Sequence, residues 1–216
     1  MTRTLLGWSA WSIMMLACLY YASLAAPYLF APAGELRLPP SSPLDEVALR
    51  LHAGGGLFAL LLGPLQFIGA VRRRAPFVHK TIGYSYVVCV ATGVAGAAML
   101  AQTPTGASAN VFAFNMLAII WALSTAMAVV NARNKRWREH QMWMIRSFAL
   151  TFAAVSLRAG MPVLGWLGFA PSDFYTIAAW ASWTINLIVA EWFIAPWLLR
   201  QGAAHHAAAM PGAPRS

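Results

Sequence analysis

The chain has 216 residues, 60% of them hydrophobic and only 10% charged, with a formal net charge of +9. This composition leaves too little polar surface to cover a water-soluble globule of this size, so it excludes an ordinary soluble domain. It indicates a membrane protein.

The apolar residues gather in six runs, each about as long as the 20 residues that cross roughly 30 Å of hydrocarbon as an α-helix. Lipid offers no hydrogen-bond partner to an open strand edge, so every run is predicted to be helical. The fold class is therefore all-α, a single polytopic bundle of six transmembrane helices over residues 1–200, followed by a disordered Ala-, Gly- and Pro-rich tail over 201–216. The predicted helices are 5–29, 47–71, 83–101, 109–130, 142–164 and 174–199.

The first run has an alternative interpretation. Arg3 precedes it and the small residues Ala22–Ala26 lie near its end, as in a cleaved secretory signal. The run is longer than a usual signal core and contains Trp8 and Trp11, so we expect a retained helix.

Basic residues predict the orientation of the bundle. Cytoplasmic loops carry an excess of Lys and Arg, so both termini are predicted to be cytoplasmic, in a bacterial inner membrane. Anionic lipid is the expected counter-charge, and nucleic acid is not an expected partner. The predicted outer side has only Arg37 and Arg50. The 11 basic residues on the predicted cytoplasmic side are Arg3, Arg72, Arg73, Arg74, Lys80, Arg133, Lys135, Arg136, Arg138, Arg200 and Arg215.

The second run has one small and polar face. At 100° per residue, its members fall within about 60° of one line along the helix. Small residues let neighbouring backbones approach, so close packing is one interpretation of this face. The other is a groove that holds a flat cofactor, with His52 at its outer mouth and Gln66 near its inner end. The face consists of His52, Gly55, Gly56, Ala59, Gly63 and Gln66.

Two histidines, His79 and His140, lie at the predicted cytoplasmic ends of the third and fifth helices. At one membrane level they are candidates for the axial ligands of a b-type haem, or for a metal site together with Glu139. The chain has no compact His and Cys spacing typical of zinc sites, and no catalytic motif that would identify catalytic residues.

Charged and amide side chains inside the membrane are expensive and therefore informative. Arg146 and Glu191 lie at depths that a long arginine spans, so they are predicted to pair, as a structural salt bridge or in a proton-coupled role. Asn186 is predicted to join helices or to contact a ligand.

Arg158 lies near the outer end of the fifth run, at about the level of His52. Its predicted partner is Asp173, Glu46 or a bound anion.

Four stretches carry a resemblance to a known family. They are "LHAGGGLFALLLGPLQF" from Leu51, "HKTIGYSY" from His79, "HQMWMIRSFALTFAAVSLR" from His140 and "AWASWTINLIVAE" ending at Glu191. Over about residues 51–192 the chain resembles the bacterial integral membrane proteins of domain-of-unknown-function family 2306. One departure is Gly83-Tyr84, where such proteins often have Gly-Arg-x-Tyr. The resemblance implies the architecture and no established activity.

A looser likeness is to cytochrome b561-like electron carriers. It rests on histidines at helix ends and on the glycine-lined face. Those proteins have histidine pairs at two depths, and here only His79 and His140 fit such a pair.

Three functions from different classes follow from these residues. One is a redox or cofactor-binding membrane subunit that uses His79 and His140. Another is a small-solute or proton-coupled transporter whose path includes Arg146, Glu191, Asn186 and Gln66. The last is a non-catalytic membrane scaffold in which the polar residues only join helices.

Overall fold

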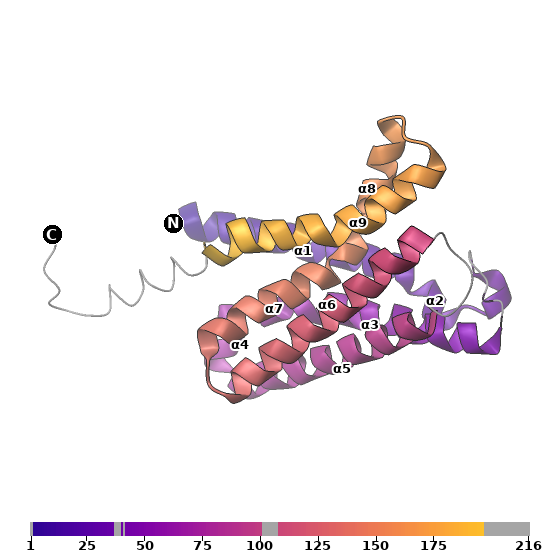
Figure 1. The fold of residues 1–216 in the computed structure, drawn as a ribbon. Helices are drawn as coiled ribbons and strands as arrows, with labels where there is room; N and C mark the ends of the chain where they lie inside the picture. Colours follow the sequence, from indigo (N-terminus) through magenta and orange to yellow (C-terminus); the bar gives the residue numbers. More distant parts are fainter. Residues whose placement is uncertain (1, 37–39, 41, 101–107, 197–216) are drawn as a thin grey trace, which may run out of the picture.

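The computed structural model describes residues 2–36, 40, 42–100 and 108–196, and every regular element in these ranges is helical (Figure 1). The all-α prediction is confirmed. The predicted tail over 201–216 lies outside the described residues. The elements are α1 (Thr2–Ala25), α2 (Pro27–Phe30), the 3-10 helix η1 (Ala33–Glu35), α3 (Pro43–Gln66), α4 (Gly69–Arg74), α5 (Pro76–Leu100), α6 (Ser108–Arg133), α7 (Trp137–Thr151), α8 (Ala153–Trp166), α9 (Pro171–Val189) and the π-helix η2 (Ala190–Ile194).

Five helical segments of the described chain are long and apolar enough to cross a membrane, and a bent pair of helices makes a sixth span. The single spans are 7–30, 43–66, 76–100, 109–133 and 173–194. The sixth consists of α7 and α8, which meet at 41°. The prediction of a multi-pass helical membrane protein is confirmed.

Several predicted helix boundaries differ from those in the structure. The second helix ends at Gln66 rather than at residue 71, because the chain turns at Phe67 before the separate short helix α4 begins. The third begins at Pro76 rather than at residue 83, so His79 lies inside the helix. Proline suits the first position of a helix, which needs no N–H donor there. Pro43 begins α3 in the same way, and Ser42 caps it by accepting a hydrogen bond from the Asp45 N–H.

The fifth predicted helix, 142–164, is broken at Phe152. Neither proline nor glycine lies at the break. Instead, the Asn186 side chain of α9 donates from Nδ2 to the Ala149 carbonyl at 3.0 Å. In an unbroken helix this carbonyl would accept from the N–H of Ala153, four residues later. Insertion of a side chain into the backbone ladder is a known cause of a sharp bend.

The closest helix packing joins α3 to α5. A Cβ added to Gly55 of α3 would lie 2.3 Å from the Gly93 nitrogen of α5, and one added to Gly96 would lie 2.4 Å from the His52 nitrogen. Only glycine allows backbones this near to each other. The packing interpretation of these small residues is confirmed.

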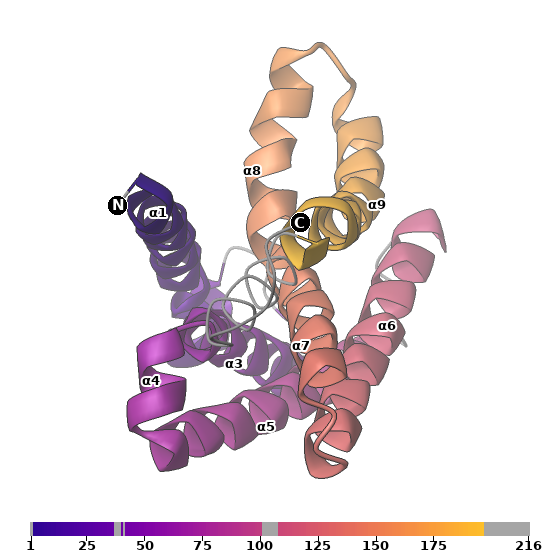
Figure 2. The same cartoon turned by 90° about the vertical axis from the view of Figure 1, so that its left-hand side faces the viewer.

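The ends of the bundle differ in charge. Figure 1 places the start of α1, α4, the turn between α6 and α7 and the end of η2 at one end, and α2 at the other. The first of these ends, called the basic end below, carries Arg72, Arg73, Arg74 and Arg133. Figures 1 and 2 both show the α8–α9 hairpin projecting from the rest of the bundle.

Candidate functional site

A buried group of polar side chains joins α5, α6 and α7 in the middle of the bundle. The hydroxyl of Tyr86 lies 2.8 Å from those of Ser147 and Thr151. Trp121 donates from Nε1 to Thr151 Oγ1 at 2.9 Å, and Thr125 Oγ1 lies 2.7 Å from Ser147 Oγ. All five side chains are buried. The sequence analysis missed this hydroxyl network. A signal was available, because Tyr86 lies seven residues after His79 and seven before Gly93, and therefore on nearly the same face of α5.

The network determines the relative level of the two candidate histidines. His79 lies seven residues before Tyr86 on α5, and His140 lies seven residues before Ser147 on α7. Both helices begin at the basic end, so they run in the same direction (Figure 1). Seven residues are about two turns, which returns a side chain to nearly the same face. The structure thus places His79 and His140 at the same end of the bundle, each two turns before a residue of the network, and the charge of His140 reaches His79.

The ring nitrogens of the two histidines differ in their partners. His140 Nδ1 lies 2.9 Å from the Ala128 carbonyl, which accepts only, so Nδ1 donates and Nε2 is left free of a proton when the ring is neutral. His79 Nδ1 is buried and has no hydrogen-bond partner in the described part of the chain. The charge of Arg72 also reaches His79.

Gln66 belongs to the same end of the bundle. It is 7% exposed, and its Nε2 has no hydrogen-bond partner among the described residues. Its Oε1 would lie 3.4 Å from a Cβ on Gly83, one helical turn after His79. Gln66, His79 and His140 therefore lie at the same end of the bundle, and they are together called the basic-end site.

The predicted cofactor groove along α3 is not there. The Gly93 backbone fills the space at Gly55, and the Phe148 ring would lie 2.2 Å from a Cβ on Gly63. His52 donates from Nδ1 to the Gly93 carbonyl at 3.0 Å. It lies fourteen residues from Gln66, about 21 Å along the helix, so the two residues do not share a site.

Arg146 and Glu191 form the predicted ion pair. Nη2 of Arg146 lies 3.1 Å from one carboxylate oxygen of Glu191, and Nε donates to the other. The guanidinium also lies 4.4 Å from the centre of the Trp143 ring. The side chains are 26% and 38% exposed, and Glu191 is part of the π-helix η2. The pair borders a shallow hollow of about 260 Å³ lined by Arg138, Glu139, Met142, Trp143 and Arg146.

Glu139 is not a metal ligand beside the histidines. Within the described ranges, no three His, Cys, Asp or Glu side chains come together as a metal-binding group. Glu139 is exposed and lines the hollow beside Arg146 instead. The proposed metal alternative with His79 and His140 is therefore wrong.

Asn186 joins helices. Its Oδ1 accepts from Ser156 Oγ of α8 at 2.9 Å, while Nδ2 binds the Ala149 carbonyl of α7. Both ends of the amide are thus used across the break at Phe152. This geometry agrees with the packing interpretation of Asn186.

The charge of Arg158 reaches both His52 and Tyr175. Its Nη1 donates to the Ala154 carbonyl of its own helix at 2.9 Å. The expected partner Glu46 was wrong, since Glu46 pairs with Arg50 at 2.7 Å.

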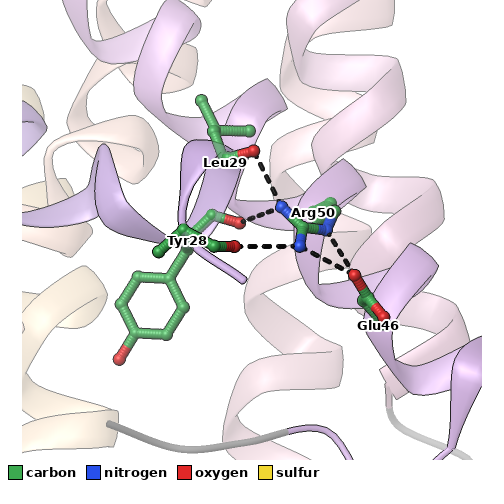
Figure 3. Close-up of polar contacts among 5 residues, drawn as sticks. Tyr28, Leu29, Glu46 and Arg50 are labelled. Carbon is green, nitrogen blue, oxygen red and sulfur yellow. Dashed lines mark hydrogen bonds and ion pairs between the residues drawn. The ribbon is translucent and has the colours of Figure 1, made fainter. Parts of the chain in front are cut away.

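Arg50 is a second residue whose role the sequence analysis missed. Its guanidinium donates to the carbonyls of Leu29 at 2.7 Å and Ala31 at 3.1 Å, while Glu46 holds its other side (Figure 3). The spacing of Glu46 and Arg50, four residues apart, is a signal for their pairing. No comparable sequence signal indicates that Arg50 satisfies carbonyls at the end of α2.

The comparison with family models covers most of this architecture. Residues 49–194 match the family described as predicted membrane protein (DUF2306). The chain belongs to this family. The DUF2306 match runs from the second turn of α3 to the end of η2, so it contains Gln66, His79, His140 and the Arg146–Glu191 pair. The predicted resemblance is confirmed.

No curated protein and no solved structure matches this DUF2306 chain. The looser likeness to cytochrome b561 proteins therefore has no support from the comparisons.

Proposed function

We propose that this DUF2306 protein is a cofactor-binding redox subunit of the bacterial cytoplasmic membrane. The candidate cofactor is a b-type haem held by His79 and His140. One observation carries this proposal: two histidines on parallel helices lie at one level, each two turns before the Tyr86 and Ser147 contact, and the charge of His140 reaches His79.

Charge supports the proposed orientation, with both termini in the cytoplasm. Arg72, Arg73 and Arg74 on α4 are exposed and share one end of the bundle with Arg133 and the start of α1. Exposed arginines at a membrane surface attract anionic lipids, which are concentrated at the cytoplasmic leaflet. The basic end is therefore proposed to face the cytoplasm and to contact anionic headgroups.

The residues present suit haem ligation. Imidazole nitrogen is a common axial ligand of haem iron. A ligating histidine usually donates its other N–H to a carbonyl, as His140 does to Ala128. The buried Nδ1 of His79 has no partner of its own in the described chain. Because the glycine face of α3 is filled, such a group belongs at the basic end and not along α3.

The neighbouring residues would each have a specific task at this site. When bound, a b-type haem supplies one-electron exchange. The Ala128 carbonyl holds the His140 ring in one tautomer and presents Nε2. The hydroxyl network fixes α5 against α7, so the two imidazoles keep their common level.

A reduced-minus-oxidised visible spectrum of the purified protein, with iron analysis of the same sample, tests this function. We expect a b-type haem signal that is lost in His79→Ala and in His140→Ala. His52→Ala is the matched control, since His52 also binds a backbone carbonyl but lies at the other end of α3. A colourless, iron-free protein produced with ample haem would contradict the proposal.

A specific observation favours a second candidate, proton-coupled transport of a small solute. The Arg146–Glu191 pair borders the hollow beside a π-helix, and the neighbouring span is broken at Phe152. Charged groups and discontinuous helices inside the membrane are typical of transport paths.

Proton flux into proteoliposomes, followed with an internal pH-sensitive dye, tests transport. We expect Glu191→Gln to abolish a solute-dependent signal that Glu35→Gln keeps, since Glu35 is exposed in η1 and does not line the hollow. Equal flux in both variants and in empty vesicles would exclude this path. A protein with neither bound haem nor proton flux would leave the non-catalytic membrane scaffold as the remaining candidate function.

A further inference from the structure

Two buried nitrogen atoms of the basic-end site have no hydrogen-bond partner among the described residues. They are Nε2 of Gln66 and Nδ1 of His79. Gln66 is nine-tenths buried, so water does not freely solvate its amide. A buried donor without an acceptor is unfavourable, and in folded proteins such groups usually have a partner.

The two atoms belong to one place in the fold. The Gln66 side chain lies against α5 at Gly83, where an added Cβ would be 3.4 Å from Oε1. Gly83 is four residues after His79, one turn along the same face of α5. A single small ligand between the end of α3 and the first turns of α5 can therefore meet both nitrogens.

The chemistry of these donors limits the ligand. An amide N–H donates strongly but carries no charge, so it suits a neutral carbonyl oxygen better than a phosphate, whose burial without a cation is expensive. The cations nearby in sequence, Arg72, Arg73 and Arg74, are exposed on α4; the charge of Arg72 reaches His79, but His79 Nδ1 has no hydrogen-bond partner among the described residues. The ligand needs an acceptor oxygen and an otherwise uncharged body.

The surroundings indicate a flat, lipid-borne molecule. Gln66 is the last residue of the apolar span formed by α3, so the site lies where that span ends. The next residue, Phe67, forms an edge-to-face pair with Phe148, with 5.5 Å between the ring centres. Aromatic rings of this kind pack readily against another ring.

We propose that Gln66 and His79 bind the ring carbonyl of a membrane quinone at the basic end. The inference rests on the proposed redox function, because the quinone would be the molecule with which this redox protein exchanges electrons. The binding itself requires only the amide of Gln66 and the imidazole of His79. Nδ1 of His79 faces the quinone, and the opposite nitrogen, Nε2, is left for the haem.

Quinone binding to the purified full chain tests the proposal. Decylubiquinone is titrated into the protein in detergent micelles, and quenching of tryptophan fluorescence gives the Kd. We expect saturable binding by the wild type and at least a tenfold weaker Kd in Gln66→Leu. Asn131→Leu is the matched control, since Asn131 is also a buried amide but its Nδ2 already donates to the Met127 carbonyl. Its Kd should remain within about twofold of the wild type. Size-exclusion profiles show that each variant is folded.

Three outcomes would overturn the inference: no saturable binding by the wild type, an unchanged Kd in Gln66→Leu, or displacement of the quinone by phosphatidylglycerol, which would identify a headgroup site. The haem proposal can be contradicted independently of the quinone proposal. A colourless protein that binds quinone through Gln66 keeps this inference and contradicts the haem. A Gln66→Leu variant with an intact haem spectrum and lost quinone binding supports both.

Discussion

Tyr86 and Ser147 place their hydroxyls 2.8 Å apart, and each stands seven residues after a histidine of the basic-end site. Since α5 and α7 run in the same direction, a contact at mid-bundle fixes the level of His79 against His140 two turns away. The hydroxyl network thus sets the relative level of His79 and His140, although it does not contact either histidine. The following predictions begin with this contact.

Removing the Tyr86 hydroxyl should destabilise the bundle. Tyr86→Phe leaves two buried hydroxyls, those of Ser147 and Thr151, with one partner fewer. The loss should be about 1–3 kcal/mol of unfolding free energy. Titration with a denaturing detergent, followed by circular dichroism, measures it. Tyr84→Phe is the control on the same helix, because Tyr84 is 60% exposed. Equal stability of the two variants would contradict the prediction.

A methyl group at Gly55 should separate α3 from α5. In Gly55→Ala the new Cβ would meet the Gly93 backbone at 2.3 Å, and backbone atoms cannot rotate away as a side chain does. Overpacking of this kind costs about 1–3 kcal/mol or more. The adjacent Gly56→Ala is the control, because nothing lies within 4 Å of its Cβ position. Thermal unfolding of both proteins in the same detergent distinguishes them. Similar melting temperatures of the two variants would mean that α3 and α5 approach each other less closely at Gly55 than the structure shows.

The Arg146–Glu191 pair should show measurable coupling. Arg146→Met and Glu191→Met each leave one partly exposed charge unpaired, whereas the double variant removes both charges. Since neither side chain is buried within the protein, with 26% and 38% left exposed, we expect a coupling energy of only about 1 kcal/mol in a double-mutant cycle. Unfolding free energies of the four proteins provide the cycle. Strictly additive losses would show that the pair contributes nothing to stability.

Replacing the Arg50 guanidinium with an amine should loosen the segment that follows α1. Arg50→Lys keeps the positive charge near Glu46 but offers one nitrogen in place of the two that donate to Leu29 and Ala31 (Figure 3). Amide hydrogen exchange over residues 28–36 should become faster by several-fold. Exchange within α7 should not change. Unaltered exchange at Ala31 would show that Arg50 does not hold this segment.

The sequence was informative where a side chain meets lipid. Long apolar runs require helices because hydrocarbon offers the backbone no partner, and all six runs correspond to spans or to the bent pair. Arg146 and Glu191 were paired correctly for a related reason: in so apolar a setting, the nearest opposite charge at a compatible depth is the favourable partner.

The sequence was less informative where helices meet one another. Ser147, Thr151 and Thr125 are common helix residues, and only the packing of three helices shows that their hydroxyls converge on Tyr86. The break at Phe152 has no local signal, since its cause is Asn186 on another helix. Pro76, by contrast, was an available signal for the start of α5, and with it His79 would have been placed inside the helix.

The crossing of Gly55 and Gly93 also bears on how the chain is assembled during synthesis. The two helices are consecutive spans joined by residues 67–75, so little loop entropy opposes their pairing. Contacts between neighbours in sequence form early, and we expect α3 and α5 to leave the insertion machinery as a preformed hairpin. Gln66 and His79 both lie on that hairpin. Two of the three residues of the basic-end site would therefore be in place before the ribosome has made His140.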